Sequence, residues 1–380
     1  GLKGALLCST VAGFEVLGEG CKNCRFQNIF IKITDDKGKL TGEVKEISPL
    51  SVTRKKRPFL DYIYIASRSS FYDLKNNHYI TDKGMTALID AEIGPRFTLR
   101  RLRADPFYTV CQEMVYDPST SQRFIKKDDG NGFDFNMSPS NEIELVDENP
   151  TIHLDHMEYM FPKSVDRKIV MDFICFIIRH PEKVTAYGLL IHGNDGIGKS
   201  YFFKLLGKIL GDRSVYSVKQ DQLESNFSGW MEGIAVGFFE EIYAGNRLTA
   251  MNKILSSVDA SKNTINIKQI PDFQIDNIIK YFFLSNSPKP IIIQGGLERR
   301  ISVIDCQNIE KKGILAENIA RDANPELTAE DLTKIGKEAH KKYFAPLFDF
   351  KNQIGAIKNY YLNVYKLEDF DPHGDAPYTD

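Results

Sequence analysis

The sequence predicts an α/β protein whose central part is built on a parallel β-sheet. Strongly apolar runs at residues 184–192, 234–239 and 278–284 have the length and composition of buried strands. Helical patterns at 164–179 and 199–210 flank the first of these runs. Strands that alternate with helices usually lie parallel, because the chain must cross the sheet before it can begin another strand in the same direction.

The composition is that of a folded chain, and it excludes several classes of protein. Of the 380 residues, 42% are hydrophobic and 26% are charged, which supplies enough apolar surface for packed cores. The formal net charge of −2 excludes a uniformly basic nucleic-acid-binding surface, although local basic patches remain compatible with it. No segment reaches the roughly 18 apolar residues of a membrane-spanning helix. We therefore expect no membrane association.

The six cysteines are scattered, and only Cys21 and Cys24 have a spacing that suits a metal site. A zinc site needs a second such pair, or histidines at the spacing of a zinc finger, and neither follows. We therefore interpret these two residues as ordinary thiols in a turn of an intracellular, cytoplasmic protein. The chain begins at Gly1 rather than Met, and we expect it to be an excised part of a longer protein.

Residues 1–150 are expected to form a smaller α+β accessory region. Patterns at 28–47 and 60–80 predict β-structure, the first of them a hairpin, and the pattern at 115–136 predicts a further hairpin. A short helix is predicted directly after Asp82, which we expect to be its N-cap.

The rest of the chain divides into a core and a helical segment. A stretch rich in Ser, Asn, Glu and Pro at 137–151 precedes the core, which we expect to span residues 151–310. Residues 311–380 are predicted to be helical, with Thr328 as the N-cap of one helix. The acidic stretch at 368–375 is expected to be a frayed tail.

The most informative segment, residues 193–200, matches G-x-x-x-x-G-K-[ST] between a predicted strand and a predicted helix. Its glycines allow backbone N–H groups to face bound phosphate, and the start of the helix adds partial positive charge. Lys199 would reach the β- and γ-phosphates, and the Ser200 hydroxyl would bind Mg²⁺. The residues predicted to bind ATP are Gly193, Asn194, Asp195, Gly196, Ile197, Gly198, Lys199 and Ser200.

Two carboxylates, Glu240 and Glu241, follow the second predicted strand. In an open parallel sheet, ligands bind beyond the carboxyl ends of the strands. Glu240 would then hold Mg²⁺, directly or through water, and Glu241 would polarise the attacking water. The alternative is a solvated acidic turn, and which glutamate takes which role remains open at this point.

Asn286 follows the third predicted strand, where an amide could hold the γ-phosphate or the attacking water without adding charge. The alternative is a simple turn before Pro288. Arg299 and Arg300 come shortly afterwards. A guanidinium can stabilise the charge that grows on a transferred phosphoryl group, but an isolated arginine pair can equally form a surface salt bridge.

Residues 263–270 alternate in character and precede Pro271, a pattern that predicts a β-hairpin with Lys268 near its tip. A lysine on a projecting hairpin can contact the phosphate backbone of DNA, and the alternative is an ordinary exposed lysine. Two basic runs, 54–57 and 96–103, could also guide DNA or could be solvated faces.

The order and spacing of these elements resemble those of the superfamily 3 helicases, the compact AAA+-like ATPases of small viruses, phages and plasmids. The chain is most similar to the helicase part of phage and plasmid primase-polymerases, on residues 159–162, 227–230 and 299–303. We therefore expect it to be the C-terminal portion of such a protein, of the kind carried by a deep-sea vent phage. The resemblance covers residues 160–305 well and the flanks poorly.

The resemblance implies an AAA+-like core that hydrolyses ATP with Mg²⁺ and forms a hexameric ring around single-stranded DNA. It also implies an upstream primase or polymerase region in the same polypeptide. The roles that it implies are Lys199 and Ser200 as Walker A residues, Glu240 and Glu241 as Walker B acids, Asn286 as polar sensor, Arg300 (or Arg299) as a finger that reaches a neighbouring subunit, and Lys268 as a DNA contact.

The function predicted from the sequence is an ATP-dependent DNA helicase or single-stranded DNA translocase in phage or plasmid DNA replication. Two alternatives are a small-molecule kinase and a nucleotide-gated recruitment module. A kinase would carry a mobile basic lid and an acceptor pocket, and neither is evident in the sequence. Guanine specificity is not expected, because residues 252–255 read Asn-Lys-Ile-Leu and lack the acid of Asn-Lys-x-Asp.

Overall fold

The computed structural model describes residues 29–34, 40–47, 59, 61–92, 98–103, 108–128, 132–138, 142–219, 221–222, 225, 227–240, 254–286 and 298–377. The chain forms two compact units. The first comprises residues 1–114 and 124–135, and the second comprises residues 115–123 and 136–380. The segment 311–380 lies in the second unit together with the predicted core.

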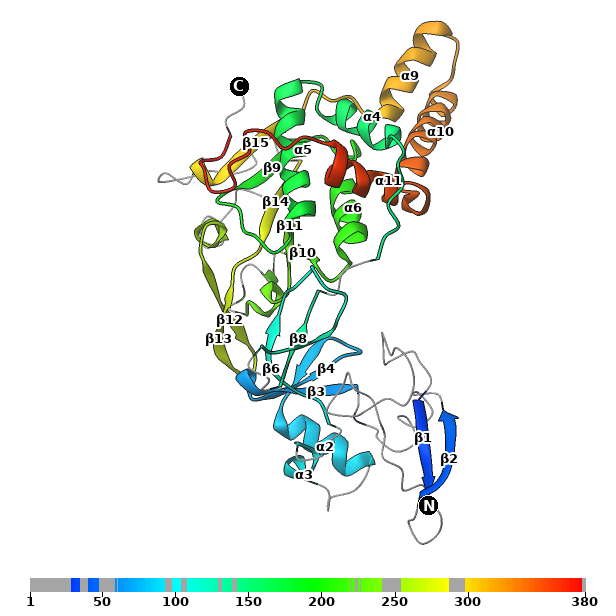
Figure 1. Cartoon of the computed structure of the whole chain (residues 1–380). Coiled ribbons are helices and arrows are strands. Elements are labelled where there is room, and N and C mark those ends of the chain that lie inside the picture. The colour runs from blue at the N-terminus through cyan, green and yellow to red at the C-terminus, as the bar shows by residue number, and fades with distance from the viewer. Residues whose placement is uncertain are drawn as a thin grey trace. The chain divides into compact units, whose positions relative to one another are not determined.

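The first unit is an α+β structure, shown in blue and cyan in Figure 1. Its first two strands, β1 (Ile29–Thr34) and β2 (Leu40–Ile47), pair antiparallel as the predicted hairpin. A six-stranded sheet follows, in the order β5-β4-β3-β6-β8-β7. Its strands are β3 (Tyr62–Ile65), β4 (Ser70–Asp73), β5 (His78–Ile80), β6 (Val110–Val115), β7 (Phe124–Lys126) and β8 (Phe133–Asn136).

Two short helices, α2 (Asp82–Glu92) and α3 (Leu99–Arg103), complete this unit. The N-cap prediction for α2 is wrong by one residue, because the Thr81 hydroxyl accepts the Gly84 N–H at 3.2 Å and Asp82 is the first helical residue. Asp82 instead accepts two hydrogen bonds, of 2.7 and 2.8 Å, from Arg103. One arginine of the second basic run is therefore held within the fold.

The second unit contains a five-stranded sheet in which every neighbouring pair is parallel, as predicted. The strand order is β10-β11-β14-β9-β15. The strands are β9 (Gly188–Gly193), β10 (Val215–Val218), β11 (Val236–Glu240), β14 (Lys280–Ser285) and β15 (Ile301–Cys306). The first strand in the chain thus lies between the last two, and β14 separates β9 from β11.

Apolar side chains cover both faces of this sheet. On one face Phe238 and Phe282 stack at 4.7 Å between ring centroids and belong to a cluster that includes helices α4 (Thr151–Met160), α5 (Ser164–Arg179) and α6 (Tyr201–Leu210). On the opposite face Phe239 and Phe283 pack with buried residues of the helical turn at 254–258. Successive residues of a strand face opposite sides of the sheet, and both sides are covered. The strands therefore appear as continuous apolar runs in the sequence.

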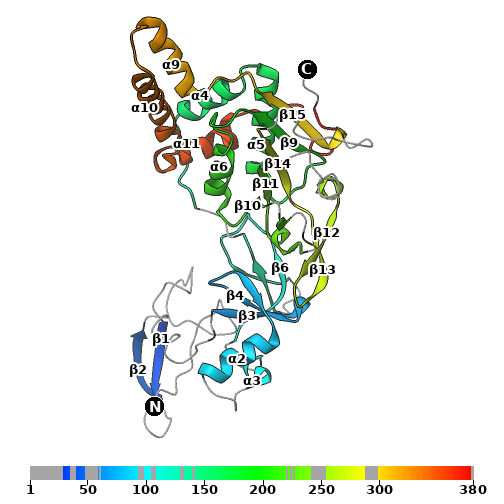
Figure 2. The same ribbon diagram turned by 180° about the vertical axis from the view of Figure 1, so that it is seen from behind.

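The C-terminal segment is helical, as predicted, and packs on the core. Helices α9 (Lys312–Ala323) and α10 (Ala329–Leu347) form a pair that is clear in Figure 2, and α11 (Ile354–Asn359) leads into a π-helical turn (Tyr360–Val364). Thr328 caps α10 through a reciprocal capping box with Asp331, as expected.

The expectation of a frayed acidic tail is wrong. Phe370 packs on Phe176 at 5.1 Å between ring centroids, and the Ala186 N–H donates to the Pro372 carbonyl at 2.7 Å. These two contacts bury apolar surface and satisfy a backbone donor, so the acidic segment packs against the rest of the second unit. Among the helices of the described residues, none has both the length and the apolar character to cross a membrane.

Candidate nucleotide-binding site

The register of the parallel strands brings the predicted site residues to one edge of the sheet. Glu240, the last residue of β11, is paired with Leu284 of β14, and Leu284 is paired with Ile191 of β9. Ser285 is paired with His192 in the same way. The ends of these three strands therefore lie level with one another, and Asn286 and the loop at 193–200 both begin at that edge.

The loop between β9 and α6 depends on glycine at two positions where close neighbours leave no room for a side chain. At Gly193, a Cβ atom would lie 2.8 Å from the Cβ of Cys306 on the adjacent strand. At Gly198 the backbone has a φ of +110°, and a Cβ would lie 2.5 Å from Cε1 of His156. The loop is thus packed tightly against β15 on one side and against α4 on the other.

The Lys199 ammonium is held over the inside of the loop. Its Nζ donates to the carbonyls of Gly193 at 2.6 Å and Asn194 at 2.7 Å, and the residue is only 9% exposed. Burial lowers the pKa of this amine and the charge of Lys311 lowers it further, whereas Asp195 acts in the opposite direction. The loop therefore presents a pre-positioned cation to an anionic ligand.

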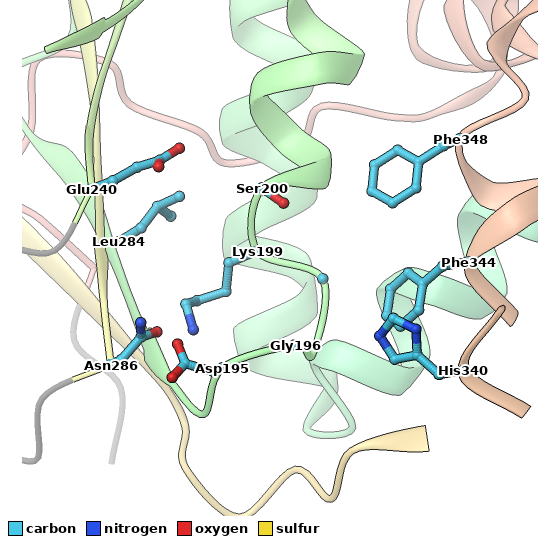
Figure 3. Close-up of a pocket in the computed structure, with 11 residues that line it drawn as sticks. Asp195, Gly196, Lys199, Ser200, Glu240, Leu284, Asn286, His340, Phe344 and Phe348 are labelled. Carbon is cyan, nitrogen blue, oxygen red and sulfur yellow. The ribbon is translucent and has the colours of Figure 1, made fainter. Parts of the chain in front are cut away.

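A cavity of about 300 Å³ opens at this edge (Figure 3). One wall is formed by the predicted residues, and the facing wall by aromatic side chains of α10 and its C-cap. The lining residues are Asp195, Gly196, Gly198, Lys199, Ser200, Glu240, Leu284, Asn286, His340, Phe344 and Phe348.

The donors and acceptors on the predicted wall fit a nucleoside triphosphate with magnesium. The Lys199 ammonium and the loop amides suit phosphate, and the Ser200 hydroxyl and Glu240 carboxylate are the hard oxygen ligands that Mg²⁺ prefers. The buried Oδ1 of Asn286 has no hydrogen-bond partner among the described residues. Such a buried, unsatisfied acceptor on the cavity wall suits a bound water or a ligand donor.

Of the eight predicted ATP-binding residues, Gly193, Asn194 and the fully buried Ile197 do not line this cavity. Three further predicted residues, Arg299, Arg300 and Lys268, do not line it either. The Arg300 guanidinium donates to the Leu255 carbonyl at 2.8 Å and forms an ion pair of 2.9 Å with Asp259. Arg299, by contrast, is exposed. Lys268 is exposed in the two-residue turn of the predicted hairpin, between β12 (Lys262–Ile267) and β13 (Ile270–Asp276). Glu241, as well as Cys21 and Cys24, lies outside the described residues.

The hairpin is joined to the sheet through the segment 228–231. The Ser228 N–H donates to the Asn266 carbonyl at 3.0 Å, and the Asn266 N–H donates to the Ser228 hydroxyl at 2.9 Å. Two residues later, Trp230 packs edge-on against Phe239 at 6.1 Å between ring centroids. Since Phe239 directly precedes Glu240, a short chain of contacts connects the cavity wall with the hairpin strand.

Sequence reasoning missed the aromatic wall of the cavity and the polar contacts behind the loop. His153 bridges the hydroxyls of Tyr201 and Tyr361, at 2.8 Å each, and His156 contacts the Tyr343 hydroxyl at 3.0 Å. A neutral imidazole can satisfy two such partners by donating one hydrogen bond and accepting the other. No motif marks these residues, and only the helical spacing of aromatic side chains near the end of α10 could have drawn attention to them.

Residues 191–300 match the sequence model of a family of unknown function, DUF5906. The DNA primase-polymerase of Nitratiruptor phage NrS-1 is 24% identical over 202 residues, which are 52% of this chain and 28% of that protein.

Solved structures of the NrS-1 C-terminal region are similar over most of the chain. One apo structure matches with a TM-score of 0.52 and 18% identity, over 78% of this chain and 68% of that one. Another structure of the region matches with a TM-score of 0.50 and 17% identity, over 77% and 65% of the two chains. This chain is related to a phage primase-polymerase and shares the fold of its C-terminal region. The predicted resemblance is thereby confirmed, whereas membership of superfamily 3 stays a prediction.

A decrease in pH is expected to destabilise the second unit through its buried histidines. Burial lowers the pKa of His153 to about 3 and that of His156 to about 4, from 6.5. Between pH 6.5 and about 4 the unfolded chain binds protons that the folded chain does not, so the free energy of unfolding decreases as the pH falls. From pH 7 to pH 5 we expect each histidine to contribute a loss of about 2 kcal/mol, measured by urea denaturation.

The variant His153→Gln is the control for this prediction, because a glutamine does not titrate in this range. Its free energy of unfolding should be lower than that of the wild type at pH 7 but should change less between pH 7 and pH 5. An equal change in the two proteins would contradict the assignment.

Proposed function

We propose that this chain is an ATP-dependent DNA motor, a helicase or single-stranded DNA translocase that acts in phage or plasmid DNA replication. The observation that carries the proposal is the cavity in which Lys199, Ser200, Glu240 and Asn286 meet at the carboxyl edge of the parallel sheet. Relationship to a primase-polymerase supports a role in replication, and supports an upstream primase or polymerase region as a partner in the same polypeptide. Such a protein would work in the host cytoplasm.

ATP with Mg²⁺ would supply the phosphoanhydride bond whose hydrolysis drives the motor. In the proposed site Lys199 and the loop amides would bind the phosphates, and Ser200 and Glu240 would hold the magnesium. Asn286 orients the attacking water through its unsatisfied Oδ1. Glu241, on the sequence pattern, polarises that water. The chain's own contribution is positioning and electrostatic stabilisation, which account for most of the catalysis of phosphoryl transfer.

Arg299 is the better candidate for the finger that completes a neighbouring site. A finger must be free to cross a subunit interface, and the ion pair of Arg300 with Asp259 keeps its guanidinium within its own chain. Arg299 is exposed in the short helical turn Glu298–Arg300 directly before β15, and in a head-to-tail interface that closes into a hexameric ring it would meet this need.

The hairpin of β12 and β13 is proposed to grip single-stranded DNA through Lys268. Its exposed lysine would contact backbone phosphates without reading sequence. The contacts from Phe239 through Trp230 and Ser228 to Asn266 provide a route by which a change at the magnesium ligand would shift the hairpin.

Lys199→Ala is expected to reduce ATP hydrolysis by about 100-fold or more, because the transferred phosphoryl group loses its main cation. Steady-state phosphate release with and without single-stranded DNA measures the effect. The control Lys208→Ala removes an exposed lysine of α6 that pairs with Asp212 at 3.6 Å, and should retain activity. Turnover near the wild-type value in Lys199→Ala would remove the proposed site.

Lys268→Ala is expected to leave basal ATP hydrolysis unchanged and to weaken its stimulation by single-stranded DNA. The affinity for DNA should fall several-fold. The slope of the logarithm of affinity against the logarithm of salt concentration should become shallower by about the value of one phosphate contact. The matched control is Lys262→Ala at the start of β12, far from the turn, where the lysine Nζ lies 4.0 Å from Oδ1 of Asp276. Equal DNA coupling in both variants would reject the role of the hairpin tip.

Arg299→Ala is expected to abolish DNA-stimulated hydrolysis without loss of nucleotide binding. If the arginine acts across an interface, mixing Arg299→Ala with Lys199→Ala should restore part of the turnover, since a Lys199→Ala subunit can supply the arginine that the intact phosphate-binding loop of an Arg299→Ala neighbour lacks. Arg300→Ala should chiefly lower thermal stability, because it leaves Asp259 unpaired. A mixture that stays inactive would contradict action in trans.

A further inference from the structure

We propose that His340 and Phe348, supported by Phe344, form the site for the nucleotide base, and that this site selects purines by stacking. The inference rests on the proposed nucleotide site, since it assigns the wall of the cavity that faces the phosphate-binding residues. The sequence motifs assign no function to these three aromatic residues.

The three side chains form a continuous aromatic surface because they recur every four residues at the end of α10 and so lie on one face of the helix. The ring centroids of His340 and Phe344 are 4.5 Å apart, and those of Phe344 and Phe348 are 6.2 Å apart with nearly parallel planes. Phe344 is 8% exposed and forms the buried middle part of this surface. His340 is exposed and Phe348 is half-buried, so both can contact a ligand.

The aromatic surface is fixed relative to the phosphate-binding loop. A Cβ atom at Gly198 would lie 3.1 Å from the Phe344 ring, so the ring packs directly on the loop backbone. Lys204 of α6 places its ammonium 4.3 Å from the centre of the Phe348 ring. These contacts fix the aromatic surface against the same loop and helix that hold Lys199 and Ser200.

The arrangement of the two walls indicates which part of a nucleotide each one binds. In Figure 3, Ser200 and Gly196 lie between the acidic and amide side chains on one side and the aromatic rings on the other. A triphosphate on the loop amides leaves the base to be accommodated on the other side. A planar base gains about 1–3 kcal/mol from stacking on an aromatic side chain, and a larger ring system gains more.

The chemistry of the aromatic surface predicts which bases it binds. Among the described residues that line this wall of the cavity, the His340 ring is the polar group and the other two side chains are phenylalanines; the Lys204 ammonium lies against the Phe348 ring and does not line the cavity. On such a surface the affinity depends on the stacked area of the base and not on hydrogen bonds to the edge of the base. ATP and GTP should therefore bind with similar affinity, and UTP should bind more weakly than either.

Calorimetry on the full chain with Mg²⁺ tests this assignment, with ATP, GTP, UTP and inorganic tripolyphosphate as probes. His340→Ala and Phe348→Ala should each weaken ATP binding by about tenfold and leave tripolyphosphate binding unchanged. The matched control is Lys341→Ala, an exposed neighbour on α10 that does not line the cavity. Lys199→Ala should weaken all four probes, since it acts on the phosphates.

Three results would overturn the inference. The first is an ATP affinity in His340→Ala and Phe348→Ala equal to that of the control variant. The second is an equal loss of ATP and tripolyphosphate in His340→Ala, whose exposed side chain is not needed for folding. The third is equal binding of UTP and ATP by the wild type. Failure of the nucleotide site itself would look different, because Lys199→Ala would then bind tripolyphosphate and ATP like the wild type.

Discussion

The parallel register of β9, β14 and β11 is the constraint on which the rest of the structure depends. It brings Gly193, Asn286 and Glu240 to one edge of the sheet, although they come from three distant parts of the sequence. A slip of one residue in either pairing would turn Glu240 or Ser285 toward a different face, because side chains alternate along a strand. Phe238 and Phe282 on one face, and Phe239 and Phe283 on the other, oppose such a slip.

The two faces of the sheet support different parts of the proposed motor. On one face, His156 packs between Gly198 of the loop and Tyr343 of α10, so the C-terminal segment holds the loop from behind. On the other face, Trp230 connects the end of β11 with the hairpin. A nucleotide that contacts both the loop and α10 would therefore bind against closely packed elements, whereas the hairpin is more exposed.

Short-range signals could be predicted from the sequence, and long-range contacts could not. The loop at 193–200, the capping box at Thr328 and the hairpin turn at Lys268 are each encoded within a few neighbouring residues. Two findings depend on elements that are distant in the sequence: the pairing of Arg300 with Asp259 and the packing of Phe370 on Phe176. The third, Thr81 as the N-cap of α2, differs from the prediction by a single residue. The aromatic residues of α10 carry no local sequence signal of a site, because only the fold places them beside the loop.

A crystal structure of the chain with Mg²⁺ and a non-hydrolysable ATP analogue tests the central claim most directly. We predict phosphate density on the amides of the loop, a metal ion held by Ser200 and Glu240, and the base against the rings of α10 and its C-cap. A nucleotide bound elsewhere, with the Lys199 ammonium still donating to the carbonyls of Gly193 and Asn194, would contradict the account.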